Sequence, residues 1–194
     1  MDADAVEIRV LGCLIEKQRT TPDAYPLSLN SLRLACNQAT SRDPVVDYDE
    51  PTIRAALERL SRRGWVRLAS GPGSRAVKYR HLFDDALGLD DAEISLLAVL
   101  MLRGPQTPGE LKQRTERLHS VAPGEVDETF GRLIDRELVT RLPRRPGQKE
   151  ERYTQLLGEE GEPEPAPRPE SSLEERVAEL EAEVARLREE LGNR

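Results

Sequence analysis

Two stretches of the chain begin with the same arrangement of polar and apolar positions. Asp4 and Glu7 precede one apolar run, and Asp90 and Glu93 precede another at a shift of 86 positions. An aspartate followed three positions later by a glutamate is typical of a capping box, in which each side chain accepts from a free backbone amide. The pattern therefore predicts a helix that begins at each of these two sites.

A second internal match relates residues 58–68 to residues 131–141, at a shift of 73 positions. Each segment contains the end of a helical pattern followed by a β-branched and apolar run. A second such run follows each time after a turn rich in Gly or Pro, which predicts a β-hairpin. The order helix, helix, helix, hairpin thus occurs twice. It predicts a mainly α fold with small β-hairpins, arranged as tandem winged helix-turn-helix domains at residues 1–84 and 85–157.

The two copies differ in the connections between their helices. The first copy has 13 more residues than the second between its first and third helices. In the second copy, Thr107 and Glu110 around Pro108 predict a compact helix start. In the first copy we expect Ser28 to cap the second helix and Asp49 or Glu50 to cap the third.

Net charge is unevenly distributed along the chain. The overall value of −7 arises entirely after residue 157, and residues 1–157 carry 24 acidic and 24 basic side chains. Between Pro51 and Leu82, eight basic side chains stand against the single acid Glu58. A concentrated positive charge of this kind favours contact with phosphates.

The third helix of the first copy presents arginines beside its apolar stripe. Ile53, Leu57 and Leu60 have the spacing of one buried helix face, so the arginines of residues 51–63 point outward. Helix arginines together with a basic hairpin are typical of a protein that reads duplex DNA. We therefore predict DNA contacts at Arg54, Arg59, Arg62, Arg75 and Lys78. The alternative is a solvated arginine face with no ligand.

The third helix of the second copy has a different outward face. Its apolar stripe is Val126, Phe130 and Leu133, which leaves mainly acidic side chains facing solvent: Asp127, Glu128, Arg132 and Asp135. An acidic face would repel phosphates. This contrast supports an alternative hypothesis, in which the chain is a tandem winged-helix scaffold for an unidentified protein partner and has little affinity for DNA.

The additional residues of the first copy carry a family resemblance. The segments GCLIEKQRTTPDAYPLSLN and ACNQATSRDPV closely resemble the signature of the YceH family, an uncharacterised family of bacterial cytoplasmic proteins built of tandem winged-helix domains. The resemblance covers residues 6–157 and implies the fold, but no catalytic residue. The polar residues of these segments either satisfy the backbone of the loops or form a partner surface. The candidates for such a surface are Glu16, Lys17, Gln18, Asn37, Gln38 and Arg42.

The sequence offers little for catalysis. Its two histidines, His81 and His119, lie far apart in the predicted plan, and no phosphate-binding glycine motif occurs. Cys13 and Cys36 fall inside apolar helical patterns, which is typical of buried thiols. We therefore expect no enzyme activity, no metal and no cofactor. A transcriptional regulator that binds double-stranded DNA is the function that the residues favour.

The last segment divides into a linker and a helix. Residues 158–170 are rich in Pro, Gly and Glu, which predicts an extended linker. Residues 171–192 contain a heptad seam that predicts a coiled-coil helix: Leu173, Val177, Leu180, Val184, Leu187 and Leu191. Attractive flanking charges favour a parallel homodimer, and the alternative is a helix that folds back on its own domains.

The chain has no apolar run of about 18 residues, the minimum for a transmembrane helix. Its amino terminus also lacks the basic and apolar regions of a secretory signal. We expect a cytoplasmic protein with no membrane partner.

Overall fold

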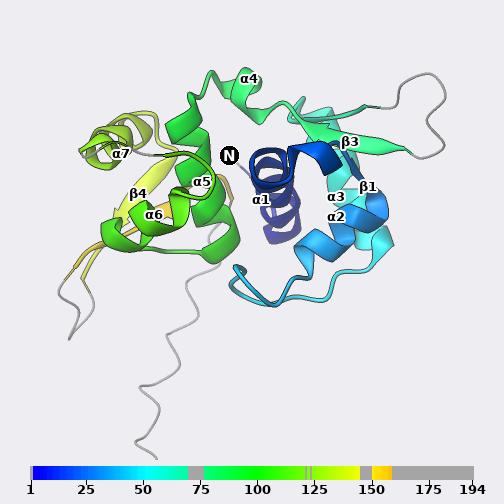
Figure 1. Ribbon diagram of the computed structural model, residues 1–194, viewed down its shortest axis with the longest axis horizontal. Helices are drawn as coiled ribbons and strands as arrows, with labels where there is room; N and C mark the ends of the chain where they lie inside the picture. Colours follow the sequence, from blue (N-terminus) through cyan, green and yellow to red (C-terminus); the bar gives the residue numbers. More distant parts are fainter. Residues whose placement is uncertain (1, 70–76, 121, 123, 145–149, 159–194) are drawn as a thin grey trace, which may run out of the picture. The chain divides into compact units, whose positions relative to one another are not determined.

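The computed structural model describes residues 2–69, 77–120, 122, 124–144 and 150–158 (Figure 1). These residues are mainly helical and include two small antiparallel sheets. The predicted mainly α fold with small β-hairpins is thereby confirmed. Arg75, the linker after Gly158 and the heptad segment lie outside the described residues.

The first copy contains three main helices and three short strands. The helices are α1 (Ala5–Thr20), α2 (Leu29–Cys36) and α3 (Glu50–Arg62). The strands are β1 (Leu27–Ser28), β2 (Val66–Leu68) and β3 (Lys78–His81). A single 3-10 turn, η1 (Pro22–Ala24), follows α1. The sheet has the order β1-β3-β2, because the short strand before α2 pairs with the far strand of the hairpin.

The second copy repeats this order with a smaller sheet. Its helices are α5 (Asp91–Arg103), α6 (Pro108–Thr115) and α7 (Glu125–Asp135), and its strands are β4 (Val139–Leu142) and β5 (Arg152–Gln155). An isolated β-bridge between Gln106 and Tyr153 takes the position that the β1–β3 pairing has in the first copy. The short helix α4 (Phe83–Leu87) connects the copies and was not predicted from the sequence.

The helix starts agree with the expected caps. Asp4 and Asp90 each form a complete capping box with the glutamate three positions later, and Thr107 does the same with Glu110. Ser28 caps α2, and Asp49 caps α3. These local side-chain bonds fix where each helix begins, because they satisfy backbone amides that have no partner inside the helix.

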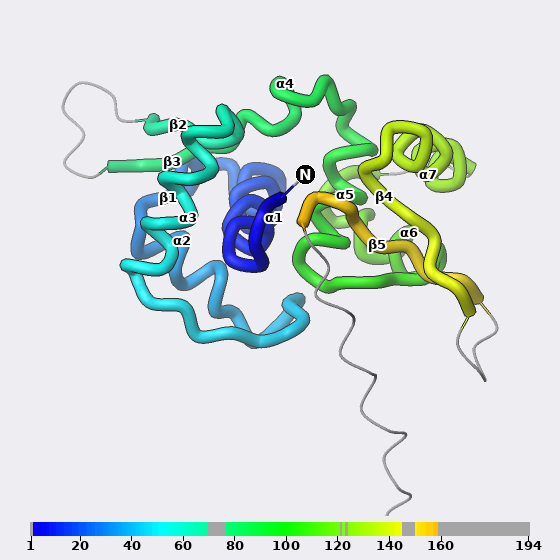
Figure 2. Tube along the Cα trace, turned by 180° about the vertical axis from the view of Figure 1, so that it is seen from behind, coloured from blue at the N-terminus to red at the C-terminus, as the bar shows by residue number. Residues whose placement is uncertain are grey.

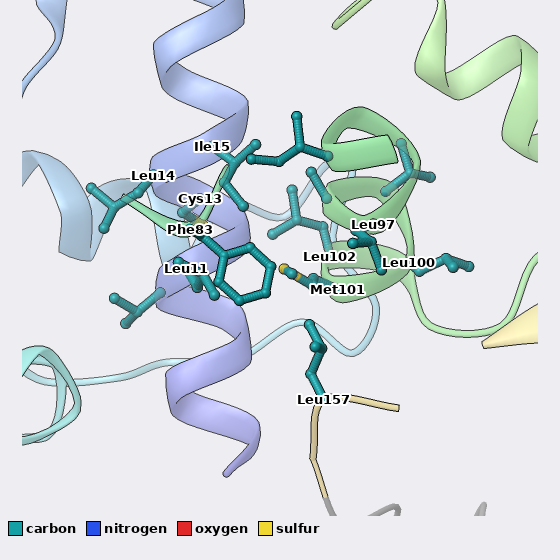
Figure 3. Close-up of a cluster of buried hydrophobic side chains, with 14 of the residues drawn as sticks. Leu11, Cys13, Leu14, Ile15, Phe83, Leu97, Leu100, Met101, Leu102 and Leu157 are labelled. Atoms are coloured by element: carbon teal, nitrogen blue, oxygen red, sulfur yellow. The ribbon is translucent and has the colours of Figure 1, made fainter. Parts of the chain in front are cut away.

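The two copies share one hydrophobic core, at whose centre α1 packs against α5. Figure 3 shows Leu11 and Ile15 of α1 beside Met101 and Leu102 of α5, with Leu157, two residues after β5, nearby. In Figures 1 and 2, α2 and α3 lie on one side of this helix pair and α6 and α7 on the other.

Close approach of α1 and α5 depends on a glycine. A Cβ atom at Gly12 would lie 3.0 Å from both Leu102 Cδ2 and Met101 Cβ. Such distances are shorter than normal carbon contacts, so a larger residue would force the helices apart. Among the described residues, no helix is both long and apolar enough to cross a membrane.

We predict that Gly12→Val destabilises the protein by about 1–3 kcal/mol, because a branched side chain overpacks the contact between α1 and α5. Gly131→Val is the matched control, since a Cβ at that helical glycine would meet nothing within 4 Å. Urea unfolding should show a large shift of the midpoint for Gly12→Val and almost none for Gly131→Val. Equal shifts would contradict the packing described for α1.

Candidate nucleic-acid interface

A groove of about 500 Å³ lies between the outward face of α3 and the β2–β3 hairpin. The helix contributes polar side chains to this groove, and the hairpin contributes Leu68 and Tyr79. The lining residues are Arg54, Leu57, Glu58, Ser61, Arg62, Leu68 and Tyr79. The concave surface therefore combines two exposed guanidinium groups with one carboxylate.

Two of the predicted DNA-binding arginines are available for a ligand. Arg54 and Arg62 are both exposed, as expected from the buried stripe of Ile53, Leu57 and Leu60. Among the described residues, no carboxylate lies within 4.0 Å of either guanidinium group, although Glu58 lies one turn from each. The hairpin adds the exposed Arg67 and the half-buried Lys78.

Arg59, also predicted to contact DNA, differs from these two arginines because it is paired with carboxylates. Its guanidinium contacts Asp4 at 2.5 Å and Glu7 at 3.5 Å, and its side chain is only 35% exposed. Arg63 lies 3.6 Å from the same buried Glu7. Both side chains therefore connect α3 to the start of α1 and are neutralised there.

The second copy contains the same set of ion pairs. Arg132 contacts Asp90 at 2.8 Å and Glu93 at 3.3 Å, and Arg136 contacts Glu93 at 3.3 Å. Glu7 and Glu93 are 2% and 4% exposed, so each capping-box glutamate is buried beneath two arginines. We call this arrangement the glutamate clamp. The sequence carries a signal for it, because the shift of 73 aligns Arg59 with Arg132 and Arg63 with Arg136, while the shift of 86 aligns Glu7 with Glu93.

The outward face of α7 is acidic, as the sequence predicts. Asp127, Glu128 and Asp135 are exposed, and its one outward arginine within the helix, Arg132, is held by the clamp. Val126, Phe130 and Leu133 are buried. The two third helices thus share an inward face and differ in the charge that they present to solvent.

Glu16 and Arg42 are interior residues, which corrects their assignment to a surface. They are 3% and 6% exposed, and Arg42 Nη2 lies 2.5 Å from Glu16 Oε2. Arg42 also donates to the backbone oxygens of Ala35 and Ser41. Burial raises the pKa of Glu16, but the hydrogen bond and charge of Arg42 outweigh this effect and lower the pKa overall.

The other candidate surface residues also make internal contacts. The Asn37 side chain accepts from the amide of Tyr48 and donates to its carbonyl, while Gln38 accepts from Arg42. Lys17 is half-buried and lies 3.9 Å from Glu16. These bonds hold the long connections of the first copy and satisfy polar groups of its loops.

The loop after α1 is anchored to β3 through His81. Tyr25 Oη accepts from the His81 amide at 2.8 Å, and the His81 ring contacts the Gln18 side chain. Burial raises the pKa of Tyr25 to about 12. Burial also lowers the pKa of His81 to about 4, assisted by Arg19 and Arg80 and opposed by Asp84 and Asp85. His81 is therefore neutral in the folded protein near pH 7.

Cys13 and Cys36 are buried free thiols, as predicted. The hydrogen bond with Cys13 raises the pKa of Cys36, and burial raises it further. The described residues contain no group of three His, Cys, Asp or Glu side chains placed to hold a metal ion.

Comparison with known proteins places the chain in a family. Residues 3–148 match the family described as "Protein of unknown function, DUF480". The chain is similar to the UPF0502 protein of Geotalea uraniireducens, with 48% identity over 97% of this chain and 91% of the relative. The UPF0502 protein of Opitutus terrae is 47% identical over 94% of this chain and 82% of the relative. The UPF0502 protein of Azotobacter vinelandii is 51% identical over 80% of this chain and 69% of the relative.

The chain belongs to the DUF480 family, also described as UPF0502. This membership agrees with the resemblance to uncharacterised YceH-like proteins seen in the sequence.

We predict that Arg42→Ala destabilises the protein by about 3–5 kcal/mol, because it leaves the buried Glu16 carboxylate without its main partner. Lys17→Ala removes a half-exposed neighbour of the same carboxylate and should cost less than about 1 kcal/mol. Urea unfolding at neutral pH separates the two results. Similar losses in both variants would contradict the buried role of Arg42.

Stability should also fall as pH decreases from about 6.5, the ordinary pKa of histidine, to about 4. The pKa of His81 is lower in the folded protein than in the unfolded chain, so the unfolded chain takes up the proton first as pH falls. The contribution of neutral His81 to stability is therefore fully present only above the ordinary pKa of histidine. The free energy of unfolding should fall by about 3 kcal/mol over this pH range. His81→Gln should flatten this part of the pH profile in urea unfolding, whereas His119→Gln should retain it. A profile unchanged by His81→Gln would contradict the prediction.

Proposed function

We propose that the protein consists of tandem winged helix-turn-helix domains and that the first domain binds double-stranded DNA. In this proposal α3 enters the major groove, and the β2–β3 hairpin lies along the phosphate backbone. Regulation of transcription by a non-catalytic, cytoplasmic protein is the function that follows.

The order and pairing of the elements support the winged-helix assignment. A short strand between the first two helices pairs with the last strand of a hairpin that follows the third helix. The Gln106–Tyr153 bridge gives the second copy the same connection in reduced form. This arrangement supports the third helix from behind and leaves its outer face available.

The free arginines of α3 carry the proposal. Arg54 and Arg62 are eight positions apart, which corresponds to about 12 Å along a helix. This spacing is close to the width of the major groove, about 12 Å, so each arginine can reach a different wall or base edge. Arg67 on the adjacent strand adds a further exposed cation for phosphate.

The second domain serves a different purpose in this proposal. The exposed acids of α7 would meet phosphates at an energetic cost, so this domain mediates contacts other than DNA binding. The heptad seam of residues 171–192 would join two chains as a parallel homodimer, which places two DNA-binding helices in one particle.

We predict that Arg54→Glu combined with Arg62→Glu lowers affinity for random duplex DNA by at least about tenfold at low salt, because both phosphate attraction and major-groove contacts are lost. The measurement is fluorescence anisotropy over a salt series. The slope of log affinity against log salt should decrease in magnitude by about 0.9 for each lost phosphate contact.

The matched control is Arg141→Glu combined with Arg144→Glu, which makes the same change in charge on the second hairpin. It should retain most of the affinity. Equal losses in the two double variants would show that only net charge matters and would contradict the assigned face. Absence of binding by the unmodified protein at low salt would favour the protein-interaction scaffold.

A further inference from the structure

A cavity of about 290 Å³ lies where the end of α1 approaches the second copy. One wall is apolar and consists of Val99, Leu102 and Leu118. The rest of the lining is polar and includes three arginines: Arg103 at the end of α5, Arg114 in α6, and Arg117 just after α6. The cavity is separate from the groove beside α3.

Positive charge exceeds negative charge around this cavity. The buried Glu16 is the one carboxylate in the lining, and it is already bound by Arg42 at 2.5 Å and Arg117 at 2.8 Å. Arg114 has a partner in Glu110 at 3.3 Å. Four guanidinium groups, including Arg42 behind the lining, therefore stand against two carboxylates.

Arg103 is the cation without a counter-ion. It is partly buried, and within the described part of the chain no carboxylate lies within 4.0 Å of its guanidinium group. Burial lowers the pKa of Arg103, and the like charges of Arg114, Arg117 and Arg42 lower it further against the opposing effect of Glu16. Because an arginine stays protonated at neutral pH, its charge among these neighbours is unfavourable until an anion binds.

A neighbouring depression extends the same charged surface. It has a volume of about 430 Å³, shares Arg103 and Arg114 with the cavity, and adds Arg152. Asp43 and Glu110 also line it, so the excess of two positive charges persists across the combined surface. Arg103 lines both spaces.

We infer that the cavity is a binding site for a small organic anion with a phosphate or carboxylate group and an apolar body. The anionic group binds Arg103 and Arg114, whose planar guanidinium groups can each donate two hydrogen bonds to such an oxyanion. The apolar body lies on Val99, Leu102 and Leu118. A volume near the lower limit of about 300 Å³ for ligand pockets suits a molecule the size of one substituted ring.

The position of the site gives such a ligand contacts with both copies. Ser41 and Glu16 of the lining come from the first copy, and the Ser41 hydroxyl can donate to an anion, while the three lining arginines come from the second copy. An anion bound there stabilises the packing of the two copies, because it neutralises charge at their junction. This inference does not depend on DNA binding by α3.

Phenyl phosphate and phthalate are suitable probes, since both combine an anionic group with a ring. Phenol is the neutral control. Titration calorimetry at low ionic strength should give a Kd below about 1 mM for at least one of the two anions and no binding of phenol. The tighter anion identifies phosphate or carboxylate as the preferred group.

Arg103→Gln combined with Arg114→Gln should weaken binding of that anion by at least about tenfold, since charge-assisted bidentate bonds are lost. Lys112→Gln is the matched control, because Lys112 is an exposed cation on α6 that does not line the cavity. It should leave the affinity unchanged. Loss of equal size in Lys112→Gln would overturn the assigned site.

Thermal unfolding without ligand checks that the variants fold. Arg103→Gln removes one of several like charges, so its Tm should be equal to or above that of the unmodified protein, and the single variant Arg114→Gln serves if the double variant unfolds. The inference fails if neither anion binds with a Kd below about 1 mM. It fails equally if the arginine variants bind the anions as tightly as the unmodified protein.

Discussion

The buried glutamate at the start of the first helix sets the orientation of the third helix in both copies. Glu7 and Glu93 each accept from the backbone of their own capping box and form ion pairs with two arginines at the end of the third helix. A carboxylate held in this way is costly to leave unpaired, so the third helix must keep its paired arginines turned toward it. The opposite edge of α3, with Arg54 and Arg62, consequently faces solvent.

The two copies share the clamp and the core, while their outward faces differ. The apolar stripes of α3 and α7 are equivalent, and each packs into the core shared through α1 and α5. Their solvent faces experience no such packing constraint, so one can carry arginines and the other carboxylates at little cost in stability.

Local signals in the sequence predicted much of the fold. Capping boxes, apolar stripes and turn residues act over a few positions, and the structure has the expected caps, buried faces and hairpin strands. The misplaced residues depend on long-range pairing. Arg59 meets Asp4 across 55 positions, and Arg42 meets Glu16 across 26. The spacing of apolar residues shows that such a side chain lies outside the buried face of its helix, but it does not show which charged neighbour pairs with it.

Arginine side-chain NMR tests the division between clamped and free residues most directly. Proton–nitrogen spectra of the full chain would be recorded during titration with duplex DNA, with the Nε–Hε signals assigned by substitution. We predict that the signals of Arg54 and Arg62 shift on binding, while those of Arg59 and Arg132 stay in place because Glu7 and Glu93 already hold them. Shifts confined to Arg59, Arg132 or the second hairpin would contradict the claim that α3 binds DNA through its free arginines.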